Sequence, residues 1–184
     1  MSFSLFDKFF KRFFPVPNFL AVPCFGLDIG DESIKFIELV NTKNGLRVGR
    51  HGERDIPGEI IEAGKIKSPK RMEEILILLR QEVGIKSVRV SLPEEQVYLF
   101  KLRLEKTDLE SIRESIELTI EEHIPIKAVD AIFDYEILNQ DAQSLELEVA
   151  AIPKDVIESY LSVFQNAGIE VQSFELEAQA IFRA

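Results

Sequence analysis

The sequence predicts an α/β protein made of two units, one inserted into the other. Alternating apolar residues, which are typical of strands, occur in six stretches, at 25–39, 46–56, 88–92, 98–104, 132–151 and 169–176. Residues 69–83, 109–120 and 155–167 instead carry apolar residues at helical spacing. This alternation of strands and helices is the basis of the α/β assignment.

Composition restricts the classes of protein to which the chain can belong. Its 184 residues are 46% hydrophobic and 29% charged, as in globular proteins long enough to bury a core. The formal net charge of −10 argues against a nucleic-acid surface, so no nucleic acid is expected as a partner. The single cysteine, Cys24, excludes an internal disulfide and fits a reducing compartment. No apolar run approaches the ~18 residues of a membrane-spanning helix.

Residues 1–23 are rich in phenylalanine and end in a linker that contains prolines. A helix here has an aromatic face and a basic face, formed by Phe3, Phe6, Phe10 and Phe13 and by Lys8, Lys11 and Arg12 respectively. Such a helix suits a membrane surface or the apolar groove of a partner. The alternative is a helix that packs on its own domain.

The hairpin at residues 25–39 is the stretch around which the first unit is organised. The turn Gly30-Asp31-Glu32-Ser33 joins its two strands; the glycine permits positive φ, and the backbone amides can cradle a phosphate. Asp28 precedes the turn, where its carboxylate can orient a hydrated Mg²⁺, and Lys35 follows it, within reach of phosphate oxygens. The alternative is an ordinary core hairpin with a polar turn.

Turn and cap residues bound the next elements of the first unit. Asn44-Gly45 predicts a tight turn into a third strand, which Pro57-Gly58 ends. Ser68 is predicted to cap a helix that Gly84 ends, and a short strand follows at 88–92.

The first unit resumes after residue 153. Asp155 and Glu158 are predicted to cap a helix that ends at Gly168. A strand at 169–176 and a last helix that stops at Ala184 follow.

A different unit is predicted at residues 96–153. Its elements, in chain order, are one strand, one helix and two further strands. Its first strand, at 98–104, alternates apolar and polar residues. Thr107 and Glu110 have capping-box spacing before the helix, and Pro125 is predicted to end that helix.

No catalytic or metal-binding set emerges from the residue pattern. His51 on a strand and His123 at a helix end are interpreted as structural, and Cys24 as a small core residue. The acidic residues of the second helix are interpreted as a solvated face, formed by Glu114, Glu117, Glu121 and Glu122.

Five short motifs follow one another along the chain: Gly26-Leu27-Asp28-Ile29-Gly30, Val90-Ser91-Leu92-Pro93, Glu122-His123-Ile124-Pro125-Ile126, Ala151-Ile152-Pro153-Lys154 and Glu175-Leu176-Glu177-Ala178-Gln179-Ala180-Ile181-Phe182-Arg183-Ala184. In this order and spacing they resemble the PilM family of type IV pilus assembly proteins, within the actin-like ATPase superfamily. Asp28, Gly30 and Lys35 match the pattern Asp-x-Gly-x-x-x-x-Lys of the superfamily's first phosphate hairpin. The resemblance implies an actin-like (ribonuclease-H-like) half, subdomain 1A, at 24–95 and 154–184, with an SHS2-type α+β subdomain, 1C, at 96–153.

The resemblance also implies a nucleotide site, with ATP and Mg²⁺ at residues around the hairpin turn. These are Asp28, Gly30, Asp31, Glu32, Ser33 and Lys35, with Asp28 holding the metal through water. Asp31 and Glu32 would repel a polyphosphate, and the chain contains only the first half of the fold. We therefore expect weak ATP binding and no enzymatic activity from the chain alone.

The function that the resemblance implies is a cytoplasmic scaffold, peripheral to the inner membrane. Its partner would be the N-terminal cytoplasmic tail of a PilN-like inner-membrane protein, bound in the groove between the two subdomains. The residues expected to contact that tail are Tyr98, Phe100, Leu102, Leu109, Ile112 and Ile116. The alternatives are an ATP-binding, FtsA-like polymerising protein that forms an oligomer, and one half of a split ATPase whose second half is a separate chain.

Overall fold

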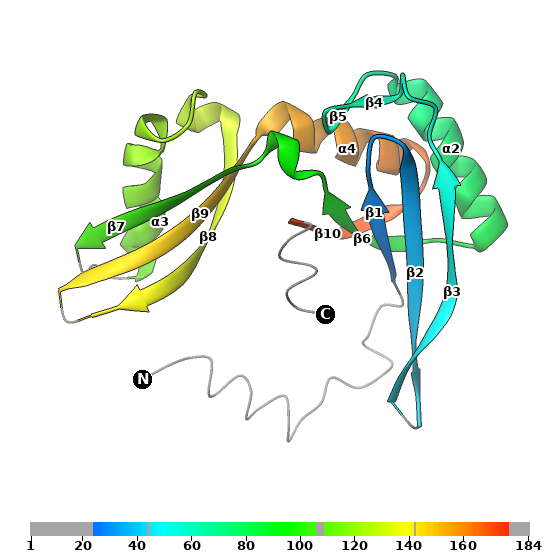
Figure 1. The fold of residues 1–184 in the computed structure, drawn as a ribbon, viewed down its shortest axis with the longest axis horizontal. Helices are drawn as coiled ribbons and strands as arrows, with labels where there is room; N and C mark the ends of the chain where they lie inside the picture. The colour runs from blue at the N-terminus through cyan, green and yellow to red at the C-terminus, as the bar shows by residue number, and fades with distance from the viewer. Residues whose placement is uncertain (1–23, 44, 106–108, 142, 177–184) are drawn as a thin grey trace.

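The computed structural model describes residues 24–43, 45–105, 109–141 and 143–176, which form two separate sheets with a core each (Figure 1). The strands are β1 (Phe25–Ile29), β2 (Ser33–Thr42), β3 (Gly45–Asp55), β4 (Ile61–Glu62), β5 (Lys65–Ile66), β6 (Ser87–Leu92), β7 (Tyr98–Glu105), β8 (Ala131–Gln140), β9 (Ser144–Pro153) and β10 (Glu170–Leu176). The helices are α2 (Pro69–Val83), α3 (Leu109–Thr119) and α4 (Lys154–Asn166), with short 3₁₀ turns at Glu94–Gln96, Ile120–Glu122 and Ala128–Asp130. The predicted helices at the two ends of the chain lie outside the described residues.

The first sheet has five strands in the order β10-β6-β1-β2-β3. β1, β2 and β3 are antiparallel, whereas β6 and β10 run parallel to β1 and to each other. Apolar residues alternate along β1, so that Phe25, Leu27 and Ile29 are buried on one face. Helices α2 and α4 cover that face and complete the larger core.

The ends of α2 agree only in part with the sequence prediction. Ser68 occupies the N-cap position, but its side chain makes no capping hydrogen bond. Gly84 ends the helix as predicted, with φ of 80°, and its amide donates to the Arg80 carbonyl at 2.8 Å.

Helix α4 ends as predicted but begins differently. Pro153 is at its N-cap and no side chain caps it, so the predicted capping role of Asp155 and Glu158 is wrong. The Asp155 carboxylate accepts a hydrogen bond from the next amide in the chain, at 3.0 Å. At the other end, the Ile169 amide donates to the Phe164 carbonyl at 2.9 Å, and Gly168 has φ of 71°. This hydrogen bond is that of a glycine-terminated helix.

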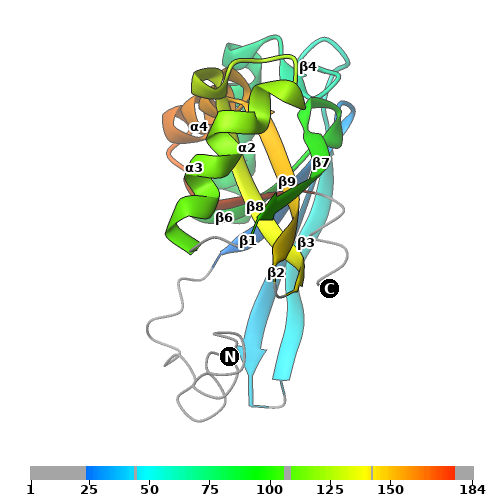
Figure 2. The same ribbon diagram turned by 90° about the vertical axis from the view of Figure 1, so that its left-hand side faces the viewer.

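The second sheet has three antiparallel strands in the order β7-β9-β8, and α3 packs on one of its faces. Ile112, Ile116 and Ile120 of the helical stripe are fully buried against this sheet. The helix gives way to a 3₁₀ turn at Ile120–Glu122, so it ends before Pro125 rather than at it. The side of α3 away from the sheet is visible in Figure 2.

The second unit is inserted between β6 and α4 of the first. The chain enters it through the 3₁₀ turn at Glu94–Gln96 and leaves it where β9 runs directly into α4. The two sheets therefore lie side by side, joined at one end by these two connections (Figure 1). Among the described residues, no helix combines the length and the apolar character needed to cross a membrane.

Candidate functional site

A row of polar residues crosses the five-stranded sheet near the carboxyl ends of its parallel strands. Strand register places Asp28 beside both Lys35 and Ser91. It also places Lys35 beside Glu53, and Ser91 beside Glu175. Ligands of α/β sheets bind outside the carboxyl ends of the strands, so this row occupies the position of a binding site. The register brings together Asp28 and Lys35, two residues of the predicted nucleotide site.

The turn between β1 and β2 does not have the conformation that the sequence predicts. Among the described glycines, positive φ occurs at Gly45, Gly64, Gly84 and Gly168, and not at Gly30. The Gly30 amide donates to the Ser33 carbonyl at 3.0 Å. This amide therefore closes the turn and does not point outward towards a phosphate.

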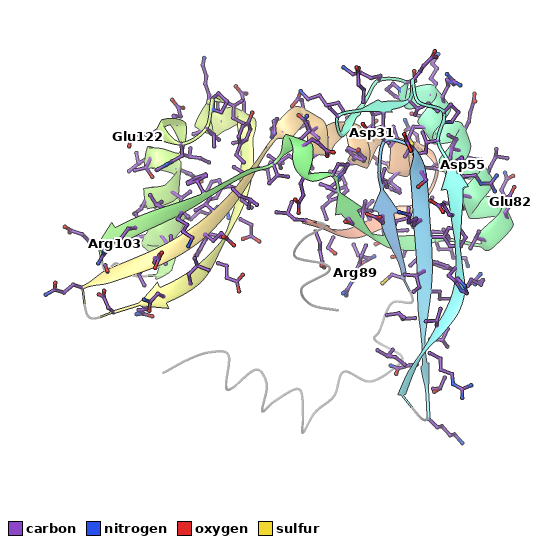
Figure 3. The ribbon with its side chains drawn as sticks, in the orientation of Figure 1. Asp31, Asp55, Glu82, Arg89, Arg103 and Glu122 are labelled. Carbon is purple, nitrogen blue, oxygen red and sulfur yellow. The ribbon has the colours of Figure 1, made fainter. Side chains whose placement is uncertain are left out.

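Asp31 connects the turn to a second loop instead of facing a ligand. Its carboxylate accepts hydrogen bonds from the amides of Ala63, at 2.8 Å, and Gly64, at 3.1 Å. Figure 3 shows Asp31 at the end of the hairpin that lies next to β4. Ser33 is also engaged within the protein, because its hydroxyl donates to Glu53 at 2.7 Å. Glu32 is exposed.

The residues of this row fit Mg·ATP poorly. Asp28 offers one carboxylate to a hydrated metal ion, but the only cation in the row is Lys35, which register places between Asp28 and Glu53. A polyphosphate meets more carboxylates than cations here. Within the described residues there is no group of three or more side chains with the arrangement of a metal site.

The loop that Asp31 holds is a small structural hub. Ala63 and Gly64 both have positive φ, of 48° and 73°. The Tyr160 hydroxyl of α4 donates to the Gly64 carbonyl at 3.0 Å, and the Gln96 amide group donates to the Ala63 carbonyl at 2.8 Å. Burial, and then the nearby charge of Asp31, raises the pKa of Tyr160 well above its ordinary value. The hub joins the hairpin, α4 and the entry to the second unit.

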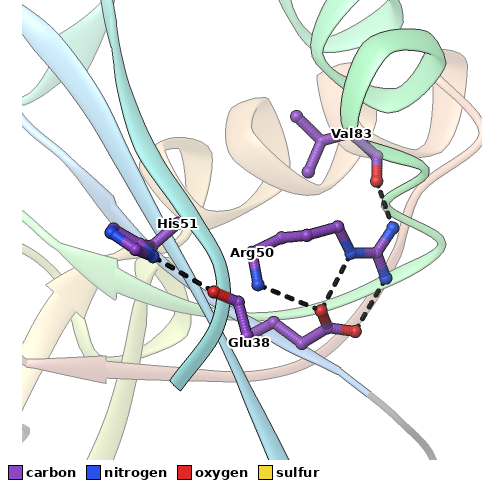
Figure 4. Close-up of polar contacts among 5 residues, drawn as sticks. Glu38, Arg50, His51 and Val83 are labelled. Carbon is purple, nitrogen blue, oxygen red and sulfur yellow. Dashed lines mark hydrogen bonds and ion pairs between the residues drawn. The ribbon is translucent and has the colours of Figure 1, made fainter.

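A second polar contact joins β2, β3 and the end of α2, at the end of β1 that lies away from the polar row (Figure 4). The Arg50 guanidinium donates two hydrogen bonds to the Glu38 carboxylate, at 2.7 and 2.8 Å, and a third to the Val83 carbonyl at the end of α2. It also lies 4.9 Å above the Phe25 ring. The hydrogen bond to Arg50 lowers the pKa of Glu38 to about 2.

A cavity of about 350 Å³ lies where the two units meet, between the face of the three-stranded sheet opposite α3 and the carboxyl ends of β6 and β10. Both units contribute apolar residues to it: Leu92, Val97, Ile132, Ala150, Ile152, Ile157, Phe174 and Leu176. Its acidic residues are Asp134, Glu136, Glu148 and Glu175. These residues were not predicted from the sequence. Ile132 and Ile152 give a signal for them, because each is an apolar residue on a strand face that also carries carboxylates.

Three of the residues predicted to contact the partner's tail are buried within the second unit. Ile112 and Ile116 are 0% exposed and Leu102 is 8% exposed, because all three fill the core between α3 and its own sheet. Phe100 stacks on His123 with ring centroids 4.6 Å apart, and Tyr98 packs against the same core. None of these described side chains lines the cavity, and the side chain of Leu109 is not described.

A protein-family model described as "Type IV pilus assembly protein PilM" matches residues 26–184. The chain belongs to this family. A chain of the solved "PilM-PilN type IV pilus biogenesis complex" has the same fold, with a TM-score of 0.78 and 20% sequence identity. That match covers 86% of this chain and 48% of the other, so this chain spans about half the length of the chain that it matches. The predicted α/β class is confirmed.

The fold also occurs outside pilus assembly. The cytoplasmic domain of EpsL, an inner-membrane component of the type II secretion system of Vibrio cholerae, matches with a TM-score of 0.57 and 13% identity. That match covers 83% of this chain and 57% of the EpsL chain. No curated protein sequence matches this chain. The membership of the PilM family supports a role in type IV pilus assembly.

Proposed function

We propose that this chain is part of a cytoplasmic scaffold, peripheral to the inner membrane, which binds the N-terminal cytoplasmic tail of a PilN-like protein. The proposed binding site is the cavity between the two sheets. One observation carries this proposal: the cavity is bounded by both units, and each unit contributes apolar residues to it. In this proposal residues 24–95 and 154–184 act as one subdomain and residues 96–153 as the other.

The size and chemistry of the cavity suit a short peptide. A volume of about 350 Å³ holds a few side chains and is too small for a folded domain. Ile132, Ile152 and Phe174 give it an apolar floor. Burying one large apolar side chain contributes roughly 1.5–3 kcal/mol, so a few anchors reach the ~8 kcal/mol of a micromolar complex after the cost of ordering the peptide.

Titration of a labelled N-terminal peptide from the organism's own PilN-like protein tests the proposal. The blocking variant is Ile132→Arg, because Ile132 lines the cavity and is 40% exposed, so that the larger side chain can be accommodated without disturbing a core. The matched control is Leu138→Arg on the same strand, where Leu138 is 44% exposed and does not line the cavity.

We expect micromolar binding by the natural chain and by Leu138→Arg, and at least a tenfold loss in Ile132→Arg. Equal binding by all three chains would place the tail elsewhere. Absence of binding to the natural chain would overturn the proposal.

A further inference from the structure

The described charged residues that line the cavity between the sheets are all acidic. Four carboxylates line it, from Asp134 and Glu136 on β8, Glu148 on β9 and Glu175 on β10. No lysine, arginine or histidine is among the described residues that line it. We infer that the cavity selects an extended segment that lies along β8 and presents lysine or arginine side chains to Asp134 and Glu136. This inference rests on the proposed function and adds the chemistry and the conformation of the bound segment.

Two carboxylates of the three-stranded sheet lie opposite each other on neighbouring strands. Strand register places Glu136 directly opposite Glu148, and like charges in that position are destabilising. Asp134 lies opposite Ala150. Register gives Glu148 one cationic neighbour, Lys101 on β7, on the side away from Glu136. A cation brought by a partner on the β8 side would therefore relieve a repulsion that the sheet leaves in place.

Among the described strands, β8 lies at the edge of the three-stranded sheet. In the order β7-β9-β8 it has β9 on one side and no described strand on the other. Five consecutive residues of this edge, 132–136, line the cavity. The Tyr135 amide is bonded at 2.9 Å to the Asp134 side chain, a local bond that a carbonyl of an added strand can replace. Extended peptides bind such edges through their main chain.

The period of a strand fixes the sequence pattern of the bound segment. Ile132, Asp134 and Glu136 alternate with the residues that face α3, so all three lie on the cavity side. An added strand places its own alternate side chains beside them. The expected pattern is one apolar residue and two basic residues, each separated by one position.

The charge of the cavity is tested with the same PilN-like peptide and the variant Asp134→Asn/Glu136→Gln. The matched control is Glu105→Gln/Glu114→Gln, which changes the net charge equally at exposed positions of the same unit that do not line the cavity. We expect at least a tenfold weaker Kd for the cavity variant and less than a twofold change for the control. Raising the salt concentration should weaken binding to the natural chain more than binding to the cavity variant.

The conformation of the segment is tested by methylating the peptide's backbone nitrogens one at a time. If the peptide pairs with β8, binding is lost at every second position and retained at the positions between. A loss without this period of two overturns the pairing with β8.

The outcomes separate this inference from the proposed function. If Ile132→Arg abolishes binding while Asp134→Asn/Glu136→Gln and salt have no effect, the tail binds in the cavity and the inferred charge recognition is wrong. If the natural chain does not bind the peptide at all, both the proposed function and this inference are overturned.

Discussion

Single charged residues in this protein hold distant parts of the chain together, and their sequence context does not reveal it. Asp31 lies in a motif that suggests a ligand site, yet its carboxylate accepts the amides of Ala63 and Gly64, more than 30 positions along the chain. Arg50 similarly joins β2 to the end of α2. A carboxylate that already accepts two backbone hydrogen bonds has less capacity left to bind a ligand. Asp31 therefore has a structural role within this motif.

Glu38 provides a prediction about pH. Its pKa is about 2 in the folded protein and 4.5 without its partner, because Arg50 stabilises the charged form. Since the folded pKa is the lower one, the contact stabilises the fold above pH 4.5, and this stabilisation is lost as the pH falls towards 2. Glu38→Gln should therefore lower the urea midpoint at pH 7 and have little effect near pH 2.

The control is Glu74→Gln, which removes an exposed carboxylate from α2. It should leave the urea midpoint at pH 7 nearly unchanged. A difference between Glu38→Gln and the natural chain that stays constant from pH 7 to pH 2 would show that the Arg50 contact does not shift this pKa.

Tyr160 provides a prediction about a buried hydrogen bond. Tyr160→Phe keeps the ring in the core but removes the donor to the Gly64 carbonyl, at 3.0 Å in the natural chain. Leaving a buried acceptor without its donor costs about 1–3 kcal/mol in the free energy of unfolding. Denaturant unfolding measures this cost, and Tyr135→Phe, at a half-buried ring, should cost less. Equal costs for the two variants would contradict a special role for the Tyr160 hydroxyl.

At the scale of elements, the sequence predicts the strands and helices whose apolar residues recur at a regular spacing. The core strands and helices α2 and α4 follow from alternation, from helical spacing and from Gly84 and Gly168 as helix ends. The two-residue strands β4 and β5 are too short to have a period, and they depend on Asp31, which is distant in the sequence. Side-chain capping by Ser68 failed for a related reason: a residue type suggests a cap, but the local geometry decides whether it forms.

Gly64 provides a prediction at this scale, because its turn joins three elements. Its φ is 73°, and an added Cβ would lie 3.1 Å from the Cβ of Pro93. Gly64→Ala should therefore reduce the free energy of unfolding by about 1–3 kcal/mol. Gly58→Ala is the control, since an added Cβ there meets nothing within 4 Å. Similar unfolding curves for both variants would show that the turn relaxes without cost.

At the scale of the whole molecule, the insertion of one unit into the other creates the candidate binding site. Each sheet has its own core, and the cavity is lined by residues of both units that are far apart in the sequence, such as Leu92, Ile152 and Phe174. No local pattern brings these residues together, so the sequence predicts a groove between the subdomains only through the family resemblance. Two of the residues that it predicted for partner binding, Ile112 and Ile116, lie instead in the core between α3 and its own sheet. Strand period cannot tell which face of a sheet a neighbouring helix will cover.

The polar row of the first sheet leads to a prediction for the whole chain, namely weak ATP binding. The Gly30 amide is used within its turn, the Asp31 carboxylate is held by backbone amides, and Lys35 is flanked by Asp28 and Glu53. With one cation among several carboxylates, the row offers little to offset the cost of fixing a polyphosphate. Calorimetry with Mg·ATP should give a Kd of about 1 mM or weaker.

Lys35→Ala and Lys43→Ala distinguish a specific site from general attraction between charges, because Lys43 is an exposed cation outside the row. Neither substitution should change the weak affinity measurably. A micromolar Kd that is lost in Lys35→Ala and kept in Lys43→Ala would contradict the prediction. It would mean that metal binding at Asp28 neutralises the row more completely than its carboxylates suggest, and phosphate release would then have to be measured.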